Sequence, residues 1–263
     1  MSDLSITALY TSQVWAWGEL PCAELFASRD GKRVFDVTNA VLGVMRRGTP
    51  LRYALLHRHA MIDHLVGAWH ARRIVEVAAG LSRRGAALSA DPAVEYVEID
   101  LPDVIARKRQ LLERSAAGRN VLARPNYALV AGDVATIALP ACDVVIAEGL
   151  VMYLDAAARR ALFAKVAALA GVRFVFDLTP ADEEPRPGVT GRLLEAAMKR
   201  FTKGRTFERD ARTRDDVVGE LRDAGFADAR AIAASDVAAS WSLPHAQRVT
   251  PTVVFTASRA SRS

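Results

Sequence analysis

Acidic side chains follow three short apolar runs of this 263-residue chain, and a glycine follows another. Gly80 comes directly after IVEVAA and Asp100 ends EYVEID, while Asp133 follows YALVAG and Glu148-Gly149 end DVVIAEG. A glycine has no side chain to occupy the space of a ligand that approaches the backbone. An acid about 20 residues later has the spacing at which a carboxylate accepts hydrogen bonds from a ribose diol. The spacing therefore suggests a nucleoside site, although a turn glycine and a surface aspartate would produce the same pattern.

The glycine turn itself limits the kind of nucleotide. The stretch AAGLSRRG, residues 78–85, does not contain GxGxxG and so lacks the close-packed turn that holds a pyrophosphate. This argues against a nicotinamide dinucleotide and a dehydrogenase. An adenosyl group without a pyrophosphate suits the turn better, and S-adenosylmethionine is the obvious candidate.

Strands and helices must place these residues together. Before residue 72 the apolar residues recur at helical spacing, and from residue 73 onward short β-rich runs alternate with helical segments. The β-rich runs are IVEVAA, EYVEID, YALVAG, DVVIAEG, RFVFDL, ADARAIAAS and PTVVFTA. The pattern predicts an α/β fold with a doubly wound, Rossmann-like, mostly parallel seven-stranded sheet, an antiparallel edge strand and an N-terminal helical cap. Ligands of such sheets bind beyond the carboxyl ends of the strands, where the acids lie.

The helices and domain limits can also be predicted. LPDVIARKRQLLERSA has a proline in its first turn, AAARRALFAKVAALA is rich in helix formers, and TRDDVVGELRDAGF has Thr213 as its N-cap and Gly225 as its stop. We expect one domain, with a cap over 1–71, a core over 72–263 and a lid or substrate collar at about 180–212. Basic residues of the lid that could meet an anionic acceptor are Arg186, Arg192, Lys199 and Arg205.

Composition excludes several classes of protein. The chain is 51% hydrophobic and 25% charged, with a net charge of +5, but it has no long basic run, so nucleic acid is not an expected partner. Cys22 and Cys142 lack the spacing of a disulfide framework or a zinc site, and no metal is predicted. Neither a leader nor a membrane-spanning stretch can be read, so we expect a cytoplasmic protein without a membrane partner.

Four motifs resemble one family. EGLVMYL and EIDLPDVIARK are the specific ones, supported by VEVAAGLS and by RHAMID at residues 58–63. Together they resemble the leucine carboxyl methyltransferase family, including a bacterial branch similar to the tetracenomycin polyketide O-methyltransferase. The similarity runs from about residue 50 to about 180 and weakly beyond. It implies a class I methyltransferase that uses S-adenosylmethionine.

The resemblance also implies a role for each matching position. Arg58 would pair with the methionine carboxylate, Gly80 would lie under the methionine moiety, and Asp100 would hold the ribose. Further contacts are implied for Leu101, Asp133, Val134, Glu148 and Gly149, with the Asp133-Val134 pair beside the adenine and Glu148 near the methionine amino group. The family commonly has GxGLDTR after the first strand, whereas this chain has AAGLSRRG, with Ser82 in place of the aspartate. That departure, with Arg83 after Ser82, shifts the local charge at this turn.

The expected reaction is methyl transfer to an oxygen of a small acidic or phenolic molecule. A carboxylate acceptor needs no general base, whereas a phenol needs a base with a pKa near neutral. The catalytic residues stay unknown; Tyr153 is a candidate to line the acceptor pocket, and His245 is the histidine best placed in a loop. The alternatives are methylation of a protein C-terminal carboxylate, or a non-catalytic domain that binds S-adenosylmethionine. The oligomeric state cannot be predicted.

Overall fold

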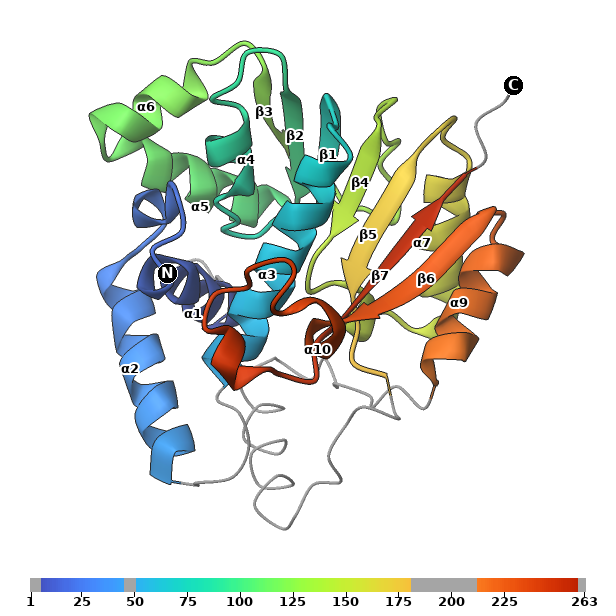
Figure 1. Cartoon of the computed structure of the whole chain (residues 1–263). Helices are drawn as coiled ribbons and strands as arrows, with labels where there is room; N and C mark the ends of the chain where they lie inside the picture. The colour runs from blue at the N-terminus through green and yellow to red at the C-terminus, as the bar shows by residue number, and fades with distance from the viewer. Residues whose placement is uncertain (1–5, 45–50, 181–211, 260–263) are drawn as a thin grey trace.

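A central sheet of seven strands organises the computed structural model, which describes residues 6–44, 51–180 and 212–259. The strand order is β3-β2-β1-β4-β5-β7-β6 (Figure 1). The strands are β1 Arg73–Val77, β2 Glu95–Asp100, β3 Tyr127–Ala131, β4 Val144–Ala147, β5 Arg173–Asp177, β6 Asp228–Ala233 and β7 Val253–Ser258. All neighbours from β3 to β5 are parallel, and β7 runs antiparallel to both β5 and β6. The predicted fold class is therefore confirmed, with the antiparallel strand one place in from the edge.

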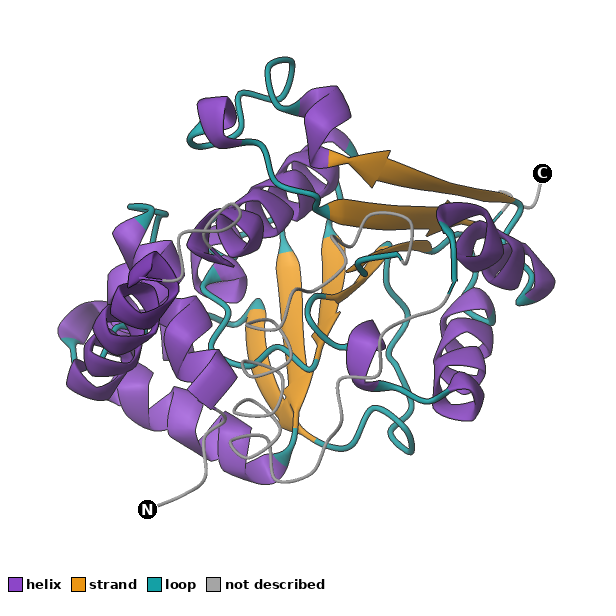
Figure 2. Cartoon of the chain, turned by 90° about the horizontal axis from the view of Figure 1, so that it is seen from below, coloured by secondary structure: helices purple, strands orange, loops and turns teal. Residues whose placement is uncertain are grey.

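Helices cover both faces of the sheet (Figure 2). The helices are α1 Ile6–Trp17, α2 Arg29–Val44, α3 Leu51–Ala68, α4 Arg84–Leu88, α5 Pro102–Glu113, α6 Ala116–Leu122, α7 Ala156–Ala167, α9 Arg214–Asp223 and α10 Ala234–Val237, with short 3₁₀ turns η1 Ala23–Leu25, η2 Val151–Tyr153 and η3 Ala246–Arg248. Apolar residues of α7 and α9 pack on one face, and those of α3, α5 and α10 pack on the other.

Side chains along β1 and β2 point alternately to the two faces of the sheet. This alternation places charged residues in the core between the sheet and helices α3, α5 and α10. Val75 and Val77 point toward α7, so Glu76 points to the opposite face with Ile74, toward α3. Glu98 of β2 alternates in the same way and lies on the same face as Tyr96. Both glutamates are fully buried. Buried charges require partners, so this face must also bury cations.

Local signals set several helix ends. Thr213 caps α9 in a reciprocal capping box with Asp216, and Gly225 follows the helix at φ 103°. Both agree with the predicted limits of this helix. Pro102 opens α5, as its position in the sequence indicates. The alternating pattern did not predict α4, which has only five residues.

The N-terminal helices are joined to the end of the chain through α3. His57 of α3 is buried, with its Nδ1 2.9 Å from Thr250 Oγ1 and its Nε2 2.8 Å from the carbonyl oxygen of Pro244. The connection between β6 and β7 therefore lies against the helical cap (Figure 1). The predicted lid at 180–212 lies almost wholly outside the described residues, and so do its four basic residues. No helix in the described ranges is long and apolar enough to cross a membrane.

Candidate cofactor site

The turn after β1 and the end of β2 form one unit. Asp100 accepts hydrogen bonds from the backbone N–H of Gly80 and of Leu101, each at 2.7 Å. Burial raises the pKa of Asp100, although the two amide donors oppose that shift. Gly80 has a φ of 52°, and a Cβ added there would meet no atom within 4 Å. The turn therefore presents open space beside a carboxylate.

The end of β3 adds the neighbouring side of this site. The N–H of Gly132 donates to the carbonyl oxygen of Asp100 at 2.8 Å, which brings the loop that carries Asp133 and Val134 beside β2. Asp133 is exposed, and its carboxylate accepts from the N–H of Ala135 at 2.9 Å. Leu101 is 43% exposed, unusual for a large apolar side chain in this protein. An exposed leucine next to a half-buried carboxylate is suited to contact a flat apolar ring.

Arg58 of α3 reaches the carboxyl ends of β4 and β5. Its Nε donates to Glu148 at 3.0 Å, and its Nη1 donates to Asp177 at 3.0 Å. Asp177 also accepts from the N–H of Gly149 at 2.5 Å. Gly149 has a φ of 67°, and a Cβ there would lie 3.1 Å from Nη2 of Arg58, so the glycine makes room for the guanidinium.

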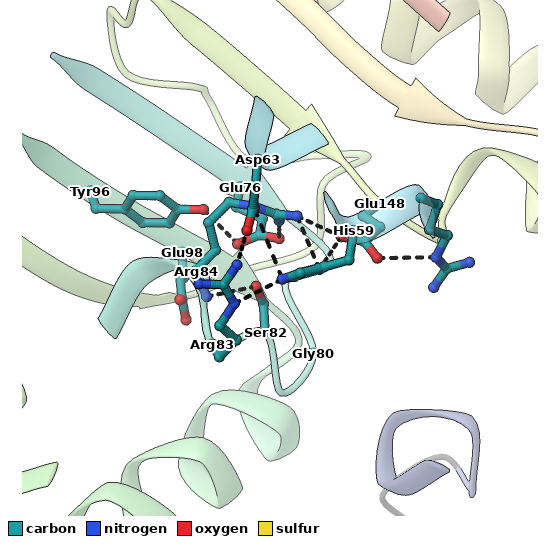
Figure 3. Close-up of polar contacts among 12 residues, drawn as sticks. His59, Asp63, Glu76, Gly80, Ser82, Arg83, Arg84, Tyr96, Glu98 and Glu148 are labelled. Atoms are coloured by element: carbon teal, nitrogen blue, oxygen red, sulfur yellow. Dashed lines mark hydrogen bonds and ion pairs between the residues drawn. The ribbon is translucent and has the colours of Figure 1, made fainter. Parts of the chain in front are cut away.

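Arg84 is the centre of a second group of ion pairs, which the sequence analysis did not predict (Figure 3). This fully buried side chain contacts Asp63 of α3 at 2.6 Å, Glu76 of β1 at 2.5 Å and Glu148 at 2.8 Å. It matches the final arginine of the family's GxGLDTR pattern. Glu148 therefore has guanidinium partners on two sides and is itself buried.

His59 completes this group as a neutral imidazole. Burial, with the guanidinium of Arg84 close by, lowers the pKa of His59 to about 3. Its Nδ1 donates to Glu148 at 2.8 Å, and its Nε2 accepts from Nε of Arg83 at 3.1 Å. Burial alone would raise the pKa of Glu148, but the donors around the carboxylate hold it well below its usual range. Glu148 is thus an anion that binds three side chains of its own protein.

The two candidate catalytic residues lie in different surroundings. Tyr153, in η2, is close to Arg58 and hydrogen bonds with Thr7 of α1; burial raises its pKa. His245 is exposed in the β6–β7 connection and stacks on Trp17, with ring centroids 5.1 Å apart. Tyr153 is therefore beside the carboxyl-end site, whereas His245 lies against the helical cap.

The structure brings together most of the predicted site residues and adds others. Arg58, Glu148 and Gly149 meet at β4, and Gly80, Asp100 and Leu101 meet at β2. Asp177, Arg84 and His59 were missed. Asp177 had a visible signal, because it ends the apolar run RFVFDL as Asp100 ends EYVEID.

Comparison with known proteins places the chain in a family. A sequence model of the leucine carboxyl methyltransferase family matches residues 20–167, more than half of the chain. The protein belongs to this family, and its cofactor is S-adenosylmethionine. A comparison with curated proteins finds no match.

Solved structures share the fold at low sequence identity. PigF with SAH has a TM-score of 0.54 and 18% identity, over 89% of this chain and 61% of that one. An O-methyltransferase family protein from Burkholderia thailandensis has a TM-score of 0.54 and 17% identity, over 98% and 73%. A possible exported protein from Bordetella parapertussis has a TM-score of 0.56 and 18% identity, over 99% and 96%. The chain thus spans less than two thirds of PigF, and these likenesses show the fold alone.

The residues at the ends of β1 and β2 fit an adenosyl group. A carboxylate offers about four lone-pair sites, and backbone amides use two of those on Asp100, which leaves acceptors for two hydroxyl groups. The open space at Gly80 admits a ligand, and exposed Leu101 offers an apolar surface. At the methionine end, Nη2 of Arg58 makes no hydrogen bond within the described ranges and remains a donor for a carboxylate.

Proposed function

We propose that the protein transfers a methyl group from S-adenosylmethionine to an oxygen of a small-molecule acceptor. The observation that carries this proposal is the carboxylate of Asp100 beside the open turn at Gly80, in a chain of the leucine carboxyl methyltransferase family. The whole chain is proposed to act as a single domain. Both cysteines are free thiols, which is compatible with the reducing cytoplasm where we place the reaction.

The chain's residues mainly bind and orient. When bound, the cofactor supplies a methyl group on a positive sulfur, which is already electrophilic. Asp100 would hold the ribose, Leu101 and Val134 would contact the adenine, and Arg58 would meet the methionine carboxylate. Holding the acceptor oxygen in line with the methyl group would contribute to the rate enhancement, because the orientation is fixed before reaction.

The described residues favour a carboxylate acceptor. His57 and His59 have both ring nitrogens engaged, and the low pKa of His59 makes it a poor base at neutral pH. Tyr153 has a raised pKa and would also be a poor base. A carboxylate is anionic at neutral pH and needs no base, so its methylation fits this site. A phenolic acceptor would instead need a general base such as His245.

Ligand-induced stabilisation tests the cofactor site. S-adenosylhomocysteine at about 100 times its Kd should stabilise the fold by about 2.7 kcal/mol. We expect Asp100→Asn to weaken binding about tenfold or more, because a charged acceptor is lost from the ribose site. Thermal unfolding with and without ligand measures both effects. Asp103→Asn, an exposed acid in the first turn of α5, is the matched control. An equal ligand effect in both variants would contradict the assignment of Asp100.

Methyl transfer itself separates an enzyme from a second candidate, a cofactor-binding domain without catalysis. The second candidate is favoured by AAGLSRRG, in which Ser82 and Arg83 replace the aspartate and threonine of the family pattern and Arg83 is buried in an ion pair with Asp63. Labelled S-adenosylmethionine is incubated with the protein and a fractionated extract, and the product is treated with base. Label on a small molecule that base releases supports a methyl ester. Label on a protein would indicate a C-terminal carboxyl acceptor, and tight cofactor binding without transfer would favour the non-catalytic domain.

A further inference from the structure

Two arginines beyond the cofactor site have no acidic partner. Arg52 of α3 and Arg248 of η3 form no ion pair within the described residues. The arginines at the cofactor site, Arg58, Arg83 and Arg84, all form them. The guanidinium carbon of each lies 5.2 Å from the ring centroid of Tyr53, and that of Arg52 lies 5.0 Å from Trp17. Aromatic rings therefore hold both cations in place without neutralising them.

The surroundings of the two arginines are cationic and partly apolar. Nε of Arg52 is buried without a hydrogen-bond partner, and its Nη1 has only a weak contact of 3.4 Å with Asn39. Arg248 is exposed, and its side chain makes no hydrogen bond within the described residues. Leu51 and Val249, the chain neighbours of the two arginines, are 40% and 39% exposed. Such a surface matches a molecule with an apolar body and an anionic group.

The position of this cluster relates it to the cofactor site. Helix α3 ends shortly before β1 begins, so its C-terminus lies near the amino ends of the parallel strands. Arg58, in the middle of the helix, contacts the carboxyl end of β5, so the start of α3 lies beyond that end. Arg52 is six residues nearer the start of α3, which is about 9 Å along the helix at 1.5 Å per residue. The cluster therefore lies beyond the carboxyl ends of the strands, the edge at which ligands of such sheets bind.

We infer that Arg52 and Arg248 bind a carboxylate at the far end of the methyl acceptor, whose apolar body lies along Leu51 and Val249. This inference rests on the proposed methyl transfer. It specifies an acceptor that carries an anionic group apart from the oxygen that is methylated. Charge-assisted hydrogen bonds from guanidinium groups give such a site its preference for carboxylate over a neutral group.

Binding of 2-naphthoate and of its neutral analogue 2-naphthamide tests the inference. Both are titrated calorimetrically into the full-length protein in the presence of S-adenosylhomocysteine. We expect the wild type to bind 2-naphthoate about tenfold more tightly than 2-naphthamide, and Arg52→Gln and Arg248→Gln to abolish that preference. Arg160→Gln, at an exposed position of α7, should keep it. Arg248→Gln alters an exposed side chain, so it provides the test even if Arg52→Gln does not fold.

The outcomes separate this inference from the proposed function. Equal affinities of 2-naphthoate for the wild type and Arg248→Gln, or no saturable binding at millimolar concentration, would overturn the carboxylate site. The affinity for S-adenosylhomocysteine is measured in the same titrations and should not change in either variant. If 2-naphthoate binding depends on both arginines but no methyl transfer is ever detected, the anion site stands and the proposed function fails.

Discussion

Ala78 has a left-handed backbone, with a φ of 50°, at the position where the family's GxGLDTR pattern has its first glycine. This region costs an L-residue about 1–2 kcal/mol, whereas glycine adopts it freely. Replacing Ala78 with glycine would remove this cost. The greater freedom of glycine in the unfolded chain would offset about 0.4–1 kcal/mol of that stabilisation. The strain at Ala78 is therefore a local cost at the turn of the proposed cofactor site.

We predict that Ala78→Gly raises the free energy of unfolding by about 0.5–1 kcal/mol. Urea unfolding measures the change. Ala79→Gly is the matched control, because Ala79 is not among the residues with positive φ. The control should lower stability by about 0.5–1 kcal/mol. A loss of stability in both variants would mean that the backbone at Ala78 is not strained.

Glu98 provides a prediction about pH. Burial raises its pKa to about 7, even though Lys108 pairs with it. In the unfolded chain a glutamate has a pKa of about 4.3. The folded protein thus binds an extra proton between these values, and the stabilisation is complete below about pH 4.3 and is lost as the pH rises through about 7.

Glu98→Gln should remove this dependence. Between pH 5 and 8 we expect the wild type to lose on the order of 1–3 kcal/mol relative to the variant, measured as the difference in free energy of unfolding. The comparison with the variant cancels the contributions of other groups. Parallel pH curves for the two proteins would show that Glu98 does not retain the extra proton.

At the scale of elements, α9 begins through a reciprocal cap that the sequence made visible. The hydroxyl of Thr213 accepts from the N–H of Asp216 at 3.2 Å, and the carboxylate of Asp216 accepts from the N–H of Thr213 at 2.8 Å. We predict that Thr213→Ala lowers stability by about 1 kcal/mol, whereas Thr213→Ser, which keeps the hydroxyl, has a smaller effect. Chemical denaturation measures both. Equal losses for the two variants would assign the effect to the methyl group instead.

Helix α3 is the element that links the parts of the molecule. Arg58, His59 and Asp63 of this helix contact groups from the sheet and from the turn after β1, while His57 holds the β6–β7 connection. Within two helical turns, residues 57–63 thus contact the β6–β7 connection, the end of β4 and the turn after β1. The motif RHAMID therefore has a structural role beyond any contact with the cofactor.

For the whole molecule, Arg84 pairs with three carboxylates, which come from α3, from β1 and from the residue after β4. Asp63, Glu76 and Glu148 all contact its guanidinium, and removing it would leave the buried carboxylates of Glu76 and Glu148 without that partner. We predict that Arg84→Met lowers the free energy of unfolding by about 3–5 kcal/mol. Arg72→Met, which breaks an exposed pair with Asp91, should cost less than about 1 kcal/mol. Similar losses in the two variants, measured by urea unfolding, would contradict a central role for Arg84.

Much of the fold and part of the site could be predicted because their signals are local. Short stretches of sequence are enough to recognise the alternating strands and helices. They are also enough to recognise the glycine turn and the acids that follow β2 and β4. The parallel order then carries those acids to one edge of the sheet. The five-residue helix α4 could not be predicted, since it is too short for periodicity to distinguish.

The sequence by itself determined the order of strands and helices, the family motifs and the carboxylate beside the Gly80 turn. Only the tertiary structure decided which charges meet. Arg84 and Glu148 are 64 positions apart, and they contact each other because β4 pairs with β1. Likewise Arg52 and Arg248 come together on Tyr53 because the β6–β7 connection packs on α3. Such contacts between distant residues depend on which helices and strands pack against each other. Burial of the whole hydrophobic core decides that packing.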